Sequence, residues 1–177
     1  MSTNRPGFED GAVEQGGFVS PQTFDAAARG RLGGPGLRTF LNIAALWQLS
    51  ERERLLALGS PARSTYHNWV SKARTGRGLS LPLDTLLRLS AMLGIHKDLR
   101  ILFGDPQRGV QWLRSANQAS LFGGQRPIDL IVSGSQMGII DVRRFLDGWR
   151  GGISAGPVDD EIEDQAWNDG DILIVDG

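Results

Sequence analysis

The stretch that most constrains the fold is residues 50–73, where two short helices are predicted around a glycine turn. Ser50 and Glu53 have the spacing of a capping box, in which each side chain accepts a hydrogen bond from the other residue's backbone N–H. Gly59 tolerates the positive φ of a tight turn, and Ser60-Pro61 predicts a second helix with a cap and a first-turn proline. This pattern predicts a helix-turn-helix, whose second helix can enter the major groove of DNA.

The second predicted helix, residues 61–73, has an apolar side and a polar side. Helical spacing places Ala62, Tyr66, Trp69 and Ala73 on the apolar side. Lys and Arg on the polar side would neutralise phosphates, whereas Asn and His would meet base edges. An ordinary solvated face is the alternative. The candidate DNA-binding residues are Arg63, Ser64, Thr65, His67, Asn68, Lys72 and Arg74.

The net charge of −1 hides a division between the two parts of the chain. Residues 1–150 hold all 19 Lys and Arg and 12 acidic residues, a net charge of +7, whereas residues 151–177 hold 8 acidic residues and no Lys or Arg, a net charge of −8. A basic body can bind phosphate backbones, and an acidic segment can bind a basic partner. Alternatively, the acidic segment only keeps the protein in solution.

Composition argues against several classes of protein. The chain has no Cys, which excludes disulfides and thiolate metal sites, and no apolar run approaches the roughly 18 residues of a membrane span. The first residues, MSTNRPGFEDG, lack the apolar region of a secretory signal, so we expect a cytoplasmic protein. His67 and His96 are the only histidines, and no nucleophile-elbow or phosphate-loop motif occurs. We therefore predict no enzymatic activity, no catalytic residue, no metal and no cofactor.

The N-terminal part predicts a leader and a scaffold helix. Residues 1–36 are rich in Gly and Pro and predict a disordered leader, apart from one turn of helix at residues 22–29. Residues 37–49 have helical apolar spacing with little charge, so this helix is expected to be buried, with Trp47 in the core. The basic loop at residues 74–78 suits either a phosphate contact or an ordinary connection.

The next segment predicts two helices separated by a glycine. Residues 80–93 carry Pro82 in the first turn and a broad apolar face. Gly94 is expected to end this helix, and residues 95–103 to form another short one. That apolar face comprises Leu83, Leu86, Leu87, Leu89 and Leu93.

The last part is also predicted to be helical. Asp105-Pro106 begins a helix through about residue 115, residues 127–131 form a short turn, and Ser135 caps a helix through Trp149. Only residues 171–176 have the character of a strand, and a single strand cannot make a sheet. The predicted fold class is all-α.

The order and spacing of several segments resemble a known family. They are Leu89-Ser90 with Leu93-Gly94-Ile95, Phe103-Gly104-Asp105 before Trp112-Leu113, and PIDLI at residues 127–131. Over about residues 37–152 the chain resembles the Xre/MbcA/ParS antitoxins of toxin–antitoxin systems. The resemblance implies an Xre-like helix-turn-helix region at residues 37–103 and a toxin-binding and dimerisation domain at residues 104–152.

The resemblance also implies a function. Such antitoxins are usually homodimers that neutralise a RES-domain toxin, which consumes NAD, and repress their own operon by binding operator DNA. NAD chemistry would belong to the toxin. The chain departs from the family in its leader, residues 1–36, and its acidic extension, residues 153–177, whose roles stay open. A transcriptional repressor without a toxin, or a DNA-segregation factor, is the alternative function.

Candidate toxin contacts lie in the C-terminal half, because Trp and Arg often anchor interfaces. Phe145 and Trp149, four residues apart on one stripe, suit a core better than an interface, and Gly138 suits either a close helix contact or a bend. The acidic residues Asp159, Asp160, Glu161, Glu163 and Asp164 are candidates for steering a basic toxin surface. The candidate toxin-binding residues are Gln125, Arg126, Gly138, Arg143, Arg144, Phe145 and Trp149.

Overall fold

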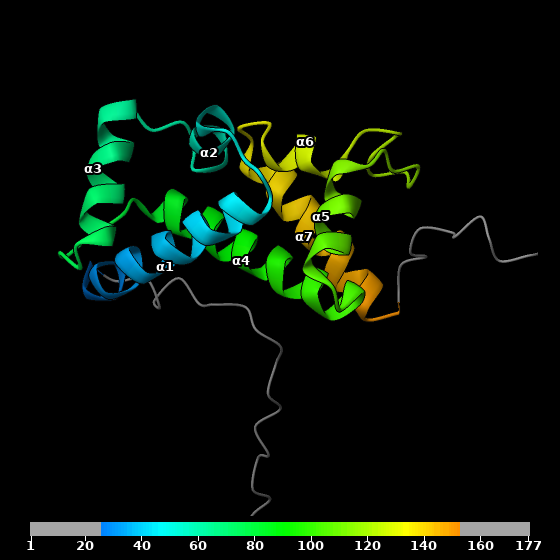
Figure 1. The fold of residues 1–177 in the computed structure, drawn as a ribbon, viewed down its shortest axis with the longest axis horizontal. Helices are drawn as coiled ribbons and strands as arrows, with labels where there is room; N and C mark the ends of the chain where they lie inside the picture. Colours follow the sequence, from blue (N-terminus) through cyan, green and yellow to red (C-terminus); the bar gives the residue numbers. More distant parts are fainter. Residues whose placement is uncertain (1–25, 153–177) are drawn as a thin grey trace, which may run out of the picture.

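A computed structural model describes residues 26–152, and this part of the chain is entirely helical (Figure 1). The predicted all-α class is confirmed for these residues. The acidic extension, the predicted strand at residues 171–176 and residues 1–25 of the leader lie outside the described residues. The helices are α1 (Ala26–Leu46), α2 (Glu51–Ala57), α3 (Arg63–Arg74), α4 (Leu83–Phe103), α5 (Pro106–Arg114), α6 (Pro127–Ile131) and α7 (Gln136–Arg150).

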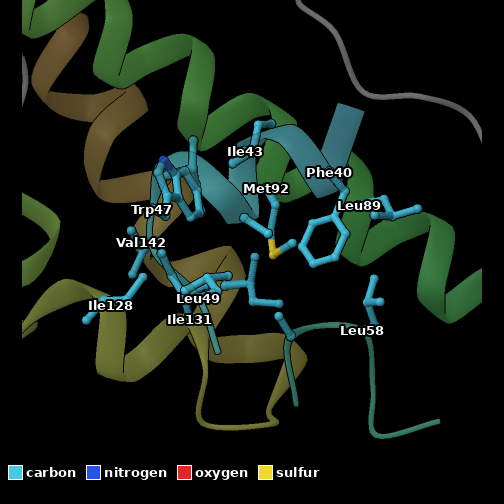
Figure 2. Close-up of a cluster of buried hydrophobic side chains, with 14 of the residues drawn as sticks. Phe40, Ile43, Trp47, Leu49, Leu58, Leu89, Met92, Ile128, Ile131 and Val142 are labelled. Carbon is cyan, nitrogen blue, oxygen red and sulfur yellow. The ribbon is translucent and has the colours of Figure 1, made fainter. Parts of the chain in front are cut away.

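Helix α4 runs through the middle of the molecule and contacts both halves of the fold. It packs on α1, which also contacts α3. It packs as well on α5 and α7, and both of these contact α6 (Figure 1). Figure 2 shows Phe40 of α1, Trp47 directly after α1, Met92 of α4, Ile131 of α6 and Val142 of α7 in one buried cluster. The N-terminal and C-terminal halves therefore share a single hydrophobic core.

Helix α1 spans Ala26–Leu46, so the prediction of disorder for residues 30–36 is wrong, whereas residues 26–29 are helical as predicted. Each glycine in this segment costs about 1 kcal/mol of helix stability relative to alanine, and Pro35 lacks an N–H to donate. Tertiary contact outweighs these costs. A Cβ on Gly33 would overlap the backbone carbonyl of Leu79, a buried residue of the loop after α3. The glycine that predicted disorder thus permits close packing.

Helix α4 is continuous, so the prediction that Gly94 ends a helix is also wrong. A Cβ on Gly94 would overlap the guanidinium of Arg143, which crosses over from α7. Glycine leaves room for that side chain here. The predicted apolar face is also too broad, because Leu83 and Leu87 are 41% and 39% exposed.

Helix ends follow the predicted caps with two corrections. The capping box at Ser50 is confirmed, as are the Asp105 and Ser135 caps. Pro82 is the N-cap of α4 rather than a first-turn residue. Ser60 does not cap α3, whose N-cap is Ala62. Instead, the N–H groups of Gly59 and Ser60 donate to the carbonyls of Leu56 and Leu55, a Schellman motif that ends α2.

Candidate functional site

Helix α3 is held by its apolar side against α1. Tyr66 and Ala73 are buried, and Trp69 is half-buried. The Arg38 guanidinium of α1 donates a hydrogen bond of 2.8 Å to the Ala73 carbonyl near the C-terminal end of α3. These contacts fix which side of α3 faces solvent.

The predicted DNA-binding residues lie on or beside this solvent-facing side. Arg63, Ser64, His67 and Asn68 are exposed near the N-terminal end, and Arg74 is exposed at the C-terminal end. Thr65 and Lys72 are half-buried. No side chain of the described residues caps α3, so its first N–H groups add partial positive charge beside Arg63. The exposed face can therefore offer both charge and base-reading groups.

Glu51 of α2 is a member of this surface that the sequence pattern did not predict. Its Oε1 lies 2.7 Å from Arg63 Nη2 and 3.7 Å from His67 Nε2. The Arg63 side chain is 76% exposed, so the ion pair contributes little stability. A carboxylate here repels an approaching phosphate. Arg63 must leave Glu51 before it can bind that phosphate. Since twelve residues separate the pair, no helical spacing reveals it.

The capping box fixes the first turn of α2, which carries Glu51. The Ser50 N–H donates to Glu53 Oε2 at 2.7 Å, and the Glu53 N–H donates to Ser50 Oγ at 3.3 Å. Burial acts to raise the pKa of the Glu53 carboxyl, but the Ser50 hydrogen bonds and the charges of Arg114 and Arg126 outweigh it and lower the pKa. Glu53 therefore stabilises this helix start in its ionised form.

In the C-terminal half, Arg143 belongs to an ion-pair network between α4 and α7. Its Nε lies 3.1 Å from Oδ2 of Asp98, which is fully buried, and 2.8 Å from Oδ2 of Asp147. Arg150 Nε lies 3.6 Å from Asp98 Oδ1. Burial raises the pKa of Asp98, and the nearby Asp147 adds to the rise, while Arg143 and Arg150 act against it. The network positions α7 on α4.

Gly138 lies at a close contact between α6 and α7. It is buried, and a Cβ there would overlap the Leu130 carbonyl of α6. Of the two predicted roles, the structure therefore supports the close helix contact.

Phe145 and Trp149 join an aromatic cluster with Phe103, Trp112 and Phe122. The Phe145 ring centroid is 4.9 Å from that of Phe122 and 6.1 Å from that of Trp112, and the Trp149 centroid is 5.6 Å from that of Phe103. Both rings are half-buried. They pack as core residues and keep part of their surface available to a partner.

The remaining predicted toxin contacts are exposed. Gln125 and Arg126 lie before α6, and Arg126 forms two hydrogen bonds with Asp129, at 2.7 and 2.9 Å. Arg144 lies on the outer side of α7. Met137, which the sequence pattern did not predict, is 57% exposed and lies two turns before Arg144 on the same stripe of α7. This stripe is a surface that α7 leaves open.

Two other classes of site are absent from the same residues. Between Ala26 and Gly152, no helix is long and apolar enough to cross a membrane. The same range contains no group of three metal-ligating side chains of the His, Asp or Glu type.

Comparisons with known proteins point to one family. Residues 98–152 match the model of the antitoxin Xre/MbcA/ParS C-terminal toxin-binding domain. The chain is also similar to the uncharacterized protein y4oB of Sinorhizobium fredii (strain NBRC 101917 / NGR234), with 42% identity over 116 residues, which make up 66% of this chain and 84% of the relative. No solved structure matches the chain.

Proposed function

Because the chain belongs to the Xre/MbcA/ParS antitoxin family, we propose that it is the antitoxin of a type II system whose toxin is a RES-domain protein that degrades NAD. The match of residues 98–152 to the toxin-binding domain carries this proposal. The antitoxin would act in the cytoplasm as a homodimer and perform no chemistry itself. Autoregulation of its operon by DNA binding is the second part of the proposal.

For the toxin contact, the outer stripe of α7 is the best-supported surface. Met137 and Arg144 are exposed on it, and an apolar anchor beside an arginine is a common interface composition. Gln125 and Arg126, which are exposed before α6, and the exposed parts of Phe145 and Trp149 toward the end of α7 are further candidate contacts. Arg143 and Gly138 act through packing, since both are engaged between helices.

For the DNA contact, the exposed side of α3 supports the proposal. Asn68 and His67 offer hydrogen-bonding groups at the centre of the face, and Arg63 and Arg74 stand near its two ends. Helix α3 is about 16–18 Å long at 1.5 Å per residue, whereas the major groove is about 12 Å wide. The ends of the helix would therefore reach the two phosphate backbones, with its centre over the bases.

The toxin part is tested by co-expression. The open reading frame adjacent to this gene would be expressed with and without this chain while growth and cellular NAD are measured. The neighbour alone should stop growth and deplete NAD, and co-expression should restore both. A neighbour that is harmless, or whose toxicity this chain leaves unchanged, would favour a repressor without a toxin.

The toxin surface is tested by a matched pair of charge reversals. Arg144→Glu on α7 should weaken co-purification with the toxin, whereas Arg108→Glu on α5 makes the same charge change at another exposed arginine and should leave it intact. Equal weakening by both variants would show a general charge effect and would remove the α7 stripe from the interface.

A further inference from the structure

A group of arginines gathers where the first turns of α1 meet the end of α3. This group, here called the basic edge, consists of Arg31 and Arg38 of α1, Arg74 at the end of α3, and Arg77 in the loop that follows. All four are exposed. Residues 26–50 and 60–83 together contain seven Lys and Arg and no Asp or Glu.

The position of Arg38 locates the edge. Its guanidinium donates to the Ala73 carbonyl at 2.8 Å and lies 3.6 Å from the place of a Cβ on Gly34, so it extends back along α1 toward the N-terminus. Arg31 precedes Arg38 by seven residues and therefore lies on the same side of α1, about two turns earlier. This places Arg31 on the side of α1 that meets the end of α3.

The loop after α3 is also held against α1 by residues near its own C-terminal end. Leu79 and Leu81 are buried, and the Leu79 carbonyl lies against Gly33. Arg77, two residues before Leu79, is thereby kept near the first turns of α1. In Figure 1 the start of α1 and the loop after α3 lie side by side.

Structural roles account for only one of the four arginines. Arg38 caps the C-terminal end of α3, a favourable place for a cation. Arg31, Arg74 and Arg77 make no side-chain hydrogen bond or ion pair with any residue between Ala26 and Gly152. Like charges gathered without counter-charges repel one another and favour a polyanionic ligand.

We propose that the basic edge is a second DNA-contact surface, which binds backbone phosphates next to those reached by the end of α3. This inference rests on the proposed function and adds the start of α1 to the DNA interface. Its contribution is independent of base sequence, because arginines on phosphates position the protein without reading bases. It also gives a role to residues 26–36, whose glycines and proline disfavour a helix.

The salt dependence of DNA binding tests the proposal. Binding to a duplex from the region upstream of this gene, and to an unrelated duplex of equal length, would be followed by fluorescence anisotropy across a range of KCl concentrations. For Arg31→Ala/Arg77→Ala, the slope of log K against log salt should fall by about 1.8, at about 0.9 for each lost phosphate contact. The fall should be equal for both duplexes.

Three further variants make the test specific. Arg31→Lys/Arg77→Lys should restore the slope, because a point charge suffices for a phosphate. Arg100→Ala/Arg108→Ala removes two exposed arginines from α4 and α5 and should leave the slope unchanged. Asn68→Ala on α3 should reduce the preference for the upstream duplex and leave the slope as it is.

Each outcome decides the question. If Arg31→Ala/Arg77→Ala keeps the parental slope while Asn68→Ala loses the preference, the basic edge is not a contact surface and the proposed function stands. If Arg100→Ala/Arg108→Ala lowers the slope equally, net charge explains the effect. The proposal that the basic edge is a contact surface is then refuted. If the parent protein binds neither duplex, both the edge and the proposed autoregulation are refuted.

Discussion

Replacement of Gly94 by alanine should destabilise the protein, although alanine is the better helix former. A helix-interior glycine costs about 1 kcal/mol relative to alanine, so sequence alone predicts a gain in stability. In the structure, the new Cβ would overlap the Arg143 guanidinium. Arg143 would have to leave Asp98, which is fully buried.

The magnitude follows from the ion pair that would be broken. At 3.1 Å between Arg143 Nε and Asp98 Oδ2, the attraction is about 5 kcal/mol at an effective dielectric constant of about 20. Loss of the partner of a buried charge typically costs about 3–5 kcal/mol. Arg143 is 31% exposed and Asp98 keeps Arg150, so we reduce the cost to about 2–3 kcal/mol. After the helix gain of about 1 kcal/mol, Gly94→Ala should lower the free energy of unfolding by about 1–2 kcal/mol.

Urea denaturation, followed by circular dichroism and tryptophan fluorescence, measures this change. In an Arg143→Ala background the clash is absent, so Gly94→Ala should instead stabilise the protein by about 1 kcal/mol. Gly30→Ala is the matched control, because a Cβ there meets nothing within 4 Å, and it should also stabilise. Two results would refute this reasoning: Gly94→Ala is as stable as the parent, or it destabilises both backgrounds equally. Either result would show that Gly94 does not serve to leave space for the Arg143 side chain.

Three other perturbations test the DNA surface and two of the carboxyls whose pKa is shifted. Glu51→Gln should release Arg63 and tighten DNA binding, most strongly at low salt; equal affinity across the salt range would exclude Glu51 from the DNA surface. Burial raises the pKa of Asp98, so the stability of the parent relative to Asp98→Asn should be greatest in acid and fall as the pH rises through the raised pKa. A pH-independent difference in the free energy of unfolding would contradict this. The capping-box hydrogen bonds of Glu53 outweigh burial and lower its pKa. The parent should therefore be more stable than Glu53→Gln above the usual pKa of 4.5, and this advantage should be lost as the pH falls through the lowered value. Denaturation of both proteins from pH 2 to 7 measures it, and an advantage that persists at the lowest pH would count against the capping-box role.

Local signals in the sequence were sufficient for the starts of α2, α5 and α7. Ser50, Asp105 and Ser135 each cap a helix through a hydrogen bond to a backbone N–H within three residues, so the pattern and the structure involve the same short segment. The apolar spacing around Tyr66 was informative for a similar reason, because one helix has one buried side. Together these signals predicted the solvent-facing side of α3.

The failures occurred where a distant segment decides the local conformation. Gly94 has the sequence context of a helix end, but Arg143, 49 residues later, makes glycine a packing requirement. Gly33 likewise faces the Leu79 carbonyl rather than solvent. In both cases the missing side chain admits a neighbour from another element, and a single sequence contains no signal of that neighbour.

The segment that matches the family model shares its core with the helices before it. The family match begins at Asp98, inside α4, whereas Met92 lies one and a half turns earlier in the same helix. Met92 packs in the core that contains Val142 of α7 and Phe40 of α1 (Figure 2). Residues 98–152 alone would leave the inner side of α7 without much of its cover. The segment that matches the toxin-binding domain therefore packs on the helices that present α3.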